Sequence, residues 1–218
     1  MRVNTIFIIL CFIGTFYVWR NGDGSMVLAY SFNSVVLNYH WWTPITALFL
    51  HGSSLHFFGN ALFMVLFGYP LEKILGKWKY TVCFLTGGVF SFLFSRIIYP
   101  ADMLMVGASG AICTIIAMVM LYDPWKLSFV LMGFPMPLGV AGLSYLILNY
   151  WLSIRSQGLH NRESFHVAYY AHILGFVAGI FFSIIWNPEW KKNLLVSLLL
   201  FILYYVGLLL LIKYFAFF

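Results

Sequence analysis

The sequence predicts an all-α membrane protein whose chain crosses the bilayer several times. Hydrophobic residues make up 63% of its 218 residues, charged residues make up only 8%, and the mean hydropathy is +0.93. Soluble domains carry roughly 25% charged residues, whereas a helix that spans a bilayer needs roughly 20 apolar residues. Several apolar segments approach that length, and the expected spans are residues 3–20, 52–70, 79–98, 109–122, 128–150, 167–186 and 193–212.

The first span follows Arg2 and ends before the polar sequence Arg-Asn-Gly-Asp-Gly at residues 20–24. Its apolar run is near the length of a signal-peptide core, but no Ala-x-Ala cleavage site follows closely. We therefore expect this segment to be retained as a membrane span.

The segment over residues 26–42 is too polar to span the membrane and too apolar for open solvent. Its tyrosines and the pair Trp41-Trp42 suit the membrane interface, where such side chains gather. Pro44 suits the first turn of a following helix. The second span then ends at residues 71–79, the most charged short loop of the chain, after which the third span begins.

The later spans are bounded by glycine, proline and polar residues. The fourth is expected to begin at Gly107–Gly110 and to end at Asp123-Pro124, and the fifth, 128–150, has a glycine and two prolines near its start. The polar residues 153–166 predict a loop, and Asn187-Pro188 ends the sixth span. The seventh span is a plain run of leucine, valine and isoleucine.

The net charge of +6, from 12 basic and 6 acidic residues, indicates topology rather than a polyanionic partner. Nucleic-acid binding needs a clustered basic face, which this sequence lacks, so no nucleic-acid partner is expected. Cytoplasmic loops collect lysine and arginine, and the 71–79 loop and Lys191-Lys192 therefore predict a cytoplasmic N-terminus. His51, Ser109 and His172 then all fall near the outer ends of spans.

The three cysteines, Cys11, Cys83 and Cys113, lie far apart in apolar segments. Their odd number argues against a full disulfide framework, and no pair has metal-ligand spacing. We expect them to be small packing residues, as buried free cysteines commonly are, and we expect neither a bound metal nor a cofactor.

Ser109 lies in the sequence Gly-Ala-Ser-Gly and heads a predicted helix. Serine in a membrane helix often bonds only its own backbone, so this motif alone is weak evidence for a nucleophile. The N–H groups at a helix N-terminus, however, point toward an incoming anion, and Gly107 and Gly110 permit close approach of backbone. This setting suits a nucleophile that stands beside an oxyanion donor.

His172 lies inside a span, where an ionisable side chain is costly unless it has a partner. It is either a hydrogen-bonded core histidine or a general base for Ser109. Gly175 and Gly179 form a Gly-x-x-x-Gly face that lets another helix approach closely. If Gly110 meets that face, Ser109 and His172 become neighbours.

His56 and Asn60 are four residues apart and so share one face of a helix. Both can donate hydrogen bonds, which favours either a polar patch that binds water or an oxyanion hole. A zinc site made of His51, His56 and His172 is a third interpretation. It is disfavoured because no carboxylate or cysteine lies at ligand spacing and because it leaves Ser109 unexplained.

The acidic residues fall in predicted loops or at the ends of predicted spans. They are Asp23, Glu72, Asp102, Asp123, Glu163 and Glu189. No buried acid is therefore expected to orient His172, and a hydrolase built on this chain would work with a Ser109–His172 dyad.

In this order, the motifs resemble the rhomboid family of intramembrane serine proteases over roughly Trp42 to Gly179. The resemblance rests on His51-x4-His56-x3-Asn60, Gly107-Ala108-Ser109-Gly110 and Ala171-His172-x2-Gly175-x3-Gly179. It implies a six-helix catalytic core, here residues 1–190, around a water-filled cavity open to the outer side. Residues 191–218 resemble the additional C-terminal transmembrane helix of some members.

The resemblance also implies roles for the site residues. Ser109 is expected to be the nucleophile and His172 the base, while His56, Asn60 and the backbone N–H of Ser109 are the expected oxyanion donors. The expected supporting residues are His51, Trp42, Gly107, Gly110, Gly175 and Gly179.

Two positions depart from the usual family pattern. Family members often carry an aromatic residue one turn after the serine, packed on the base, where this chain has Cys113. We expect Tyr169 or Tyr170 to pack on His172 instead. Trp42 is followed by Thr43, where an arginine is frequent in the family.

The expected function is therefore that of an intramembrane serine endopeptidase, with transmembrane proteins as substrates and the lipid bilayer as its environment. Cleavage is expected in or near the transmembrane segments of those substrates. One alternative is a catalytically inactive rhomboid-like protein that binds membrane proteins or serves their quality control, and another is a transporter or channel. Inactive relatives usually lack the nucleophile or the base, and both are present here. A compact chain of this kind suggests a bacterial inner membrane, by analogy alone.

Overall fold

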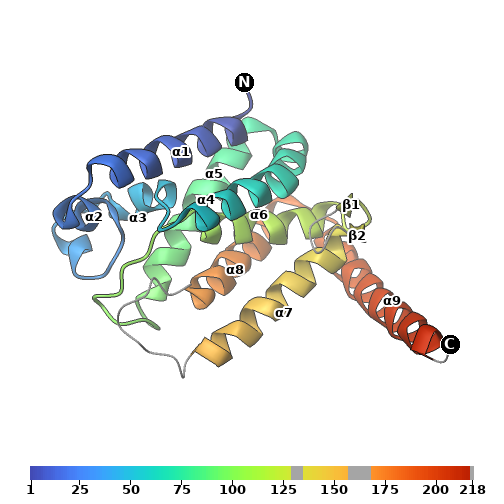
Figure 1. Ribbon diagram of the computed structural model, residues 1–218. Helices are drawn as coiled ribbons and strands as arrows, with labels where there is room; N and C mark the ends of the chain where they lie inside the picture. The colour runs from blue at the N-terminus through green and yellow to red at the C-terminus, as the bar shows by residue number, and fades with distance from the viewer. Residues whose placement is uncertain (129–134, 157–167, 217–218) are drawn as a thin grey trace.

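The buried helix α6 (Ser109–Tyr122) lies at the centre of a helical bundle (Figure 1). The computed structural model describes residues 1–128, 135–156 and 168–216. Every residue from Gly110 to Leu121 is buried, as expected for a helix that is apolar on all sides. The helices that surround it or pack on its neighbours are α1 (Val3–Asn21), α4 (Ser54–Phe63), α5 (Tyr69–Ser95), α7 (Leu138–Ser156), α8 (Tyr169–Trp186) and α9 (Trp190–Ala216).

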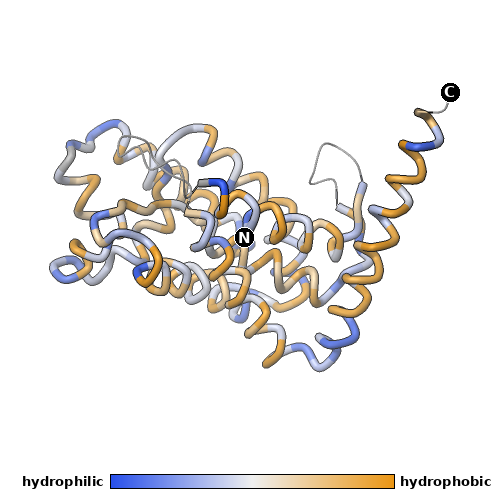
Figure 2. Tube along the Cα trace, turned by 90° about the horizontal axis from the view of Figure 1, so that it is seen from below, coloured by the Kyte–Doolittle hydropathy of each residue, from blue (hydrophilic) through white to orange (hydrophobic). Residues whose placement is uncertain are grey.

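The helices present an apolar surface to their surroundings. Four stretches of described helix are long and apolar enough to cross a membrane, namely Val3–Asn21, Ser54–Ser95, Tyr169–Trp186 and Trp190–Ala216. In Figure 2 the hydrophobic colour dominates the long helices, α9 above all. Large apolar side chains such as Phe12, Ile13 and Leu203 are exposed, which suits a lipid environment rather than water. The predicted class, an all-α multi-pass membrane protein, is confirmed.

Gly76 separates the second and third predicted spans. Its φ of 76° and ψ of 168° are not helical and break α5 at this residue. A positive φ is readily available only to glycine. The long apolar stretch Ser54–Ser95 is thereby divided near the place where the sequence predicts a charged loop.

A buried polar network joins the start of α1 to the second span. The Glu72 carboxylate accepts hydrogen bonds from the N–H groups of Val3 at 2.8 Å and Asn4 at 3.0 Å. Asn4 donates to the carbonyl oxygen of Met64 at 2.9 Å and accepts from the Tyr80 hydroxyl at 2.5 Å. Met64 opens a π-helical turn, η3 (Met64–Gly68), so the Asn4 amide bonds to a carbonyl at the start of this irregular turn. The prediction that Glu72 lies in a loop was wrong. Glu72 lies buried in α5, and its carboxylate caps the start of α1.

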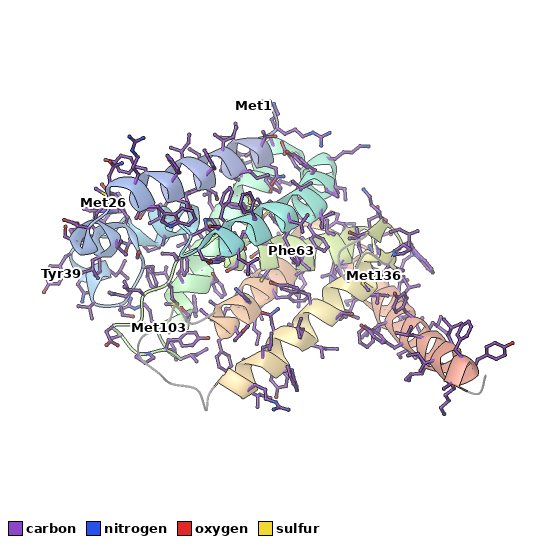
Figure 3. The ribbon with its side chains drawn as sticks, in the orientation of Figure 1. Met1, Met26, Tyr39, Phe63, Met103 and Met136 are labelled. Atoms are coloured by element: carbon purple, nitrogen blue, oxygen red, sulfur yellow. The ribbon has the colours of Figure 1, made fainter. Side chains whose placement is uncertain are left out.

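The segment between the first two spans gathers at one end of the bundle, where Figure 3 labels Met26 and Tyr39. Its short elements are α2 (Gly24–Tyr30), η1 (Val36–Asn38), α3 (Thr43–Thr46) and η2 (Ala47–Phe49). Trp42 donates from its indole to the carbonyl oxygen of Ala29 at 3.1 Å. Phe32 pairs with Met105, which ties this segment to the loop that leads into α6.

The predicted boundaries of the fifth span, 128–150, were wrong. The helix α7 begins at Leu138 and continues to Ser156, while β1 (Leu127–Ser128) pairs antiparallel with β2 (Met136–Pro137) before it. Proline lacks a backbone N–H and is not tolerated in a helix interior, so the helix starts only after Pro137. The predicted loop 153–166 loses its first four residues to α7, and its remainder lies outside the described residues.

The first part of α9 packs closely on the rest of the bundle. Asn193 donates to the carbonyl oxygen of Leu121 at 2.7 Å, and the hydroxyls of Ser144 and Tyr205 are 2.9 Å apart. Farther along, α9 projects away from the other helices (Figure 1). The division of the chain into a core over 1–190 and an added helix over 191–218 stays a prediction.

Candidate active site

Ser109 and His172 meet where α6 crosses α8. The Oγ atom of Ser109 lies 2.8 Å from Nε2 of His172. The helices approach this closely because neither carries a side chain at the crossing, where a Cβ on Gly175 would overlap the carbonyl oxygen of Gly110. One turn farther along α6, the Thr114 hydroxyl donates to the carbonyl oxygen of Gly175 at 2.8 Å and so ties the two helices together.

Gly179 extends the same contact by one turn. A Cβ at this position would overlap the carbonyl oxygen of Thr114 and would lie 2.7 Å from the Cβ of Ala117. The structure therefore brings together the glycine face of α8 and the start of α6, as the spacing of these residues predicts.

The other ring nitrogen of His172 also has a partner, which the sequence analysis did not name. Nδ1 of His172 lies 2.7 Å from Oδ1 of Asn149, a buried residue on α7. The sequence offers no buried acid for this role, and the neutral amide of Asn149 was not anticipated. The available signal was an amide within an apolar segment, since a buried polar side chain needs a hydrogen-bond partner.

His56 and Asn60 reach the site from α4 and lie against the loop before Ser109. A Cβ on Gly107 would lie 2.7 Å from Nε2 of His56 and 3.4 Å from Nδ2 of Asn60. Gly107 has a φ of 117°, which favours glycine, and its N–H donates to the carbonyl oxygen of Ala47 at 2.8 Å. Both donors are thus held beside the N-terminus of α6.

The amide nitrogen of Asn60 is an unused donor. Nδ2 is buried and, within the described part of the chain, has no hydrogen-bond partner. Buried donors are nearly always paired, and an exception calls for an explanation. A group that is free to donate beside Ser109 suits an acceptor brought in by a substrate.

These side chains share a cavity of about 280 Å³, which is lined by His56, Asn60, Ser109 and His172 together with mostly apolar residues. Phe63, labelled in Figure 3, lines it from α4, and its ring lies 5.5 Å from that of Tyr145 on α7. The cavity places polar groups from α4, α6 and α8 around one apolar space.

His51 supports the site from the loop before α4. Its Nδ1 lies 3.0 Å from the Thr15 hydroxyl, its carbonyl oxygen accepts from the Trp19 indole at 3.0 Å, and its ring stands edge-on to His56 at 4.9 Å. Burial, and next to it the proximity of His56, lowers the pKa of His51 to about 3. A neutral His51 therefore joins α1 to the histidine that lines the cavity.

Aromatic residues from other positions lie near the site where this chain has Cys113 in place of the aromatic residue frequent in the family. The Cys113 thiol lies 3.7 Å from the Tyr145 hydroxyl, so an aromatic residue from α7 stands beside the small side chain. Tyr169 presents its ring at 90° to His172 with centroids 6.2 Å apart, whereas the N–H of Tyr170 donates to the Tyr99 hydroxyl at 3.0 Å. Of the two tyrosines, Tyr169 is the one whose ring lies beside His172.

The fold and the site together define a multi-pass membrane protein that carries the side-chain arrangement of a serine hydrolase at the end of a buried helix. The family model for the Rhomboid domain matches residues 38–189. The chain belongs to the rhomboid family.

Three similar proteins support this assignment. A candidate rhomboid protease of Bacillus subtilis (strain 168), YdcA, is 35% identical over 81 residues, which are 37% of this chain and 41% of that protein. The chloroplastic Rhomboid-like protein 11 of Arabidopsis thaliana is 30% identical over 125 residues, 55% of this chain and 42% of that one. The Rhomboid-type serine protease 2 of Emericella nidulans is 28% identical over 81 residues, 37% of this chain and 16% of its own. The matches thus span less than half the length of each relative.

Proposed function

We propose that the chain is an intramembrane serine endopeptidase that cleaves transmembrane proteins in or near their spans. The observation that carries this proposal is the 2.8 Å contact between Ser109 Oγ and His172 Nε2 at the wall of a cavity. A nucleophile within hydrogen-bond reach of a base is the arrangement that covalent acyl transfer requires.

The side chains suit each step of peptide hydrolysis. Ser109 Oγ attacks the scissile carbonyl carbon while His172 Nε2 accepts the hydroxyl proton. The resulting oxyanion accepts hydrogen bonds from the Ser109 N–H, Asn60 Nδ2 and His56. His172 then protonates the leaving amine. In the second half of the reaction His172 accepts a proton from water, the water oxygen attacks the acyl carbon, and His172 returns the proton to Ser109 Oγ as it leaves.

The length of α6 supports chemistry below the membrane surface. Its 14 residues span about 21 Å, whereas the hydrocarbon core of a bilayer is roughly 30 Å thick. With Asp123 at one interface, Ser109 therefore lies inside the apolar layer. A helical substrate hides its peptide bonds in its own hydrogen bonds there, so residues that weaken the helix near the scissile bond should favour cleavage.

We propose a cytoplasmic N-terminus and a site that opens to the outer side. Lys79 lies 5.4 Å from the Trp186 ring at the end of α8, and Lys191-Lys192 precede Asn193, which bonds to the far end of α6. These lysines thus gather at the end opposite Ser109, and basic residues favour the cytoplasmic side. A bacterial cell membrane is the proposed residence, and one of the three relatives, that of Bacillus subtilis, is bacterial. Reporter fusions at the two termini test the orientation.

The experiment needs no known substrate. The protein, purified in detergent, is treated with a fluorophosphonate probe beside Ser109→Ala, His172→Ala and the control Ser183→Ala. This control removes a buried serine of α8 whose hydroxyl donates to the Gly179 carbonyl of the same helix at 2.9 Å. We expect labelling at Ser109 in the wild type and the control, and none in the other two. If folded wild-type protein stays unlabelled while a known rhomboid protease is labelled, the inactive-scaffold alternative replaces this proposal.

A further inference from the structure

Asn149 is an amide inside a largely apolar helix, and both of its polar ends are occupied. It lies in the interior of α7 and is 4% exposed. A buried amide without partners costs several kcal/mol, so its hydrogen bonds explain how it is accommodated but not why it is there. A leucine at this position would avoid the cost altogether.

The two hydrogen bonds fix the direction in which the amide points. Nδ2 of Asn149 donates to the carbonyl oxygen of Tyr145, one turn earlier, at 2.9 Å. The opposite end, Oδ1, is then left to face Nδ1 of His172 at 2.7 Å. A carbonyl oxygen only accepts, so Nδ1 must carry the proton.

Protonation at Nδ1 decides the state of the rest of the ring. A neutral imidazole has one donor and one acceptor nitrogen, and Nε2 is therefore the acceptor that faces the Ser109 hydroxyl. The opposite tautomer would donate a hydrogen bond to Ser109 Oγ and could not take its proton. Asn149 thus selects the tautomer in which His172 is a base.

The surroundings of Asn149 hold α7 in the required position. Tyr145 contacts the Cys113 thiol of α6 and packs its ring at a tilt against that of Phe63 of α4, while Ser144 bonds with Tyr205 of α9. Contacts on three sides therefore keep the amide at a fixed distance from His172.

We propose that Asn149 is the positioning residue of this site, which holds His172 in its reactive tautomer and orientation. The proposal rests on the proposed function, since it concerns the base of that reaction. A neutral amide cannot stabilise an imidazolium as the carboxylate of a catalytic triad does, so its removal should cost less than the roughly 10⁴-fold found when that carboxylate is replaced. We expect a fall in kcat of about 10- to 100-fold, as for leaving one buried donor, here Nδ1 of His172, without its acceptor.

The test compares Asn149→Ala and Asn149→Asp with wild type in proteoliposomes that contain a cleavable transmembrane reporter. Asn149→Ala should lower kcat by about 10- to 100-fold and leave KM within about twofold, because the amide touches no substrate. Asn149→Asp keeps an acceptor at the same place, and its protonated form also keeps a donor for the Tyr145 carbonyl, so it should recover most of the loss. The control is Asn193→Ala, which removes another buried amide, bonded to Leu121 at 2.7 Å and far from the cavity, and should leave kcat unchanged.

A second measurement does not depend on activity. Selective ¹⁵N labelling of histidine rings reports which nitrogen of His172 carries the proton, with His172→Ala used to assign the signals. We expect an Nδ1–H tautomer in wild type and a mixture of tautomers in Asn149→Ala.

Each result bears on one proposal. Full kcat in Asn149→Ala, an equal loss in the alanine and aspartate variants, or an unchanged tautomer signal would overturn the positioning role. Absence of Ser109-dependent cleavage in the wild type would instead overturn the proposed function, and the tautomer measurement would still decide whether Asn149 orients His172.

Discussion

Replacement of Asn60 by alanine should separate catalysis from stability. The substitution removes an amide whose Nδ2 is buried and, among the described residues, bonds to nothing. Folding therefore loses no hydrogen bond made by that nitrogen, whereas the reaction loses one of the proposed oxyanion donors.

The size of each effect follows from that difference. Removal of one oxyanion donor typically costs about 10²–10³-fold in kcat, or roughly 2.7–4 kcal/mol of transition-state stabilisation. The side chain lines an existing cavity, so its truncation enlarges an open space rather than creating a sealed void. The free energy of unfolding should thus change by less than about 1 kcal/mol, within the range of substitutions that break no native contact of consequence.

The assay pairs reporter cleavage in proteoliposomes with thermal unfolding in detergent. Asn193→Ala is the matched control, because its amide donates to Leu121 at 2.7 Å, and it should lower stability by about 1 kcal/mol while cleavage continues at the wild-type rate. Wild-type kcat in Asn60→Ala would refute the assignment of Asn60 as an oxyanion donor. A loss of activity matched by a large loss of stability would show instead that Asn60 holds the fold.

Three further predictions concern the supporting residues. Gly175→Ala forces α8 away from the Gly110 carbonyl and should lower stability by about 1–3 kcal/mol and cleavage by up to about 10²-fold. Gly207→Ala, with no described atom within 4 Å of the new Cβ, should leave cleavage unchanged and raise stability slightly, because alanine is favoured over glycine in a helix interior by about 1 kcal/mol; equal behaviour of the two variants would contradict the close-packing argument. Glu72→Ala leaves two backbone N–H groups of α1 without their acceptor and should cost about 2–5 kcal/mol in thermal unfolding, with wild-type activity per folded molecule. His51 has a folded pKa of about 3 against roughly 6.5 when unfolded, so the stabilisation by neutral His51 is full above about pH 6.5 and is lost as the pH falls toward 3. The stability of His51→Gln should therefore fall less steeply with pH over that window, and parallel curves of stability against pH for the variant and the wild type would contradict this prediction.

The fold and the contact between Ser109 and His172 could be predicted because each depends on a strong local signal. Long apolar runs with sharp polar ends, such as that of α8, fix helices within a few residues. The glycine spacing on α8 anticipates its contact with Gly110, because only residues without a Cβ allow such an approach. The burial of Glu72 could not be predicted, since its partners are backbone groups 68 and 69 positions away in the sequence and the neighbouring lysines suggest an exposed loop.

The wrong predicted bounds of α7 also explain why the role of Asn149 was not anticipated. With a span placed at 128–150, Asn149 stands at its last turn, where an amide that reaches water is unremarkable. The structure begins the helix at Leu138 and carries it to Ser156, so the same residue falls in the interior of the apolar helix. A buried amide at that depth needs a partner, and His172, which is equally costly to bury alone, needs one too. Correct boundaries for α7 would therefore have predicted the pair from the sequence. They also make the site dependent on α7, because any displacement of this helix from α8 breaks the bond that holds His172 ready for Ser109.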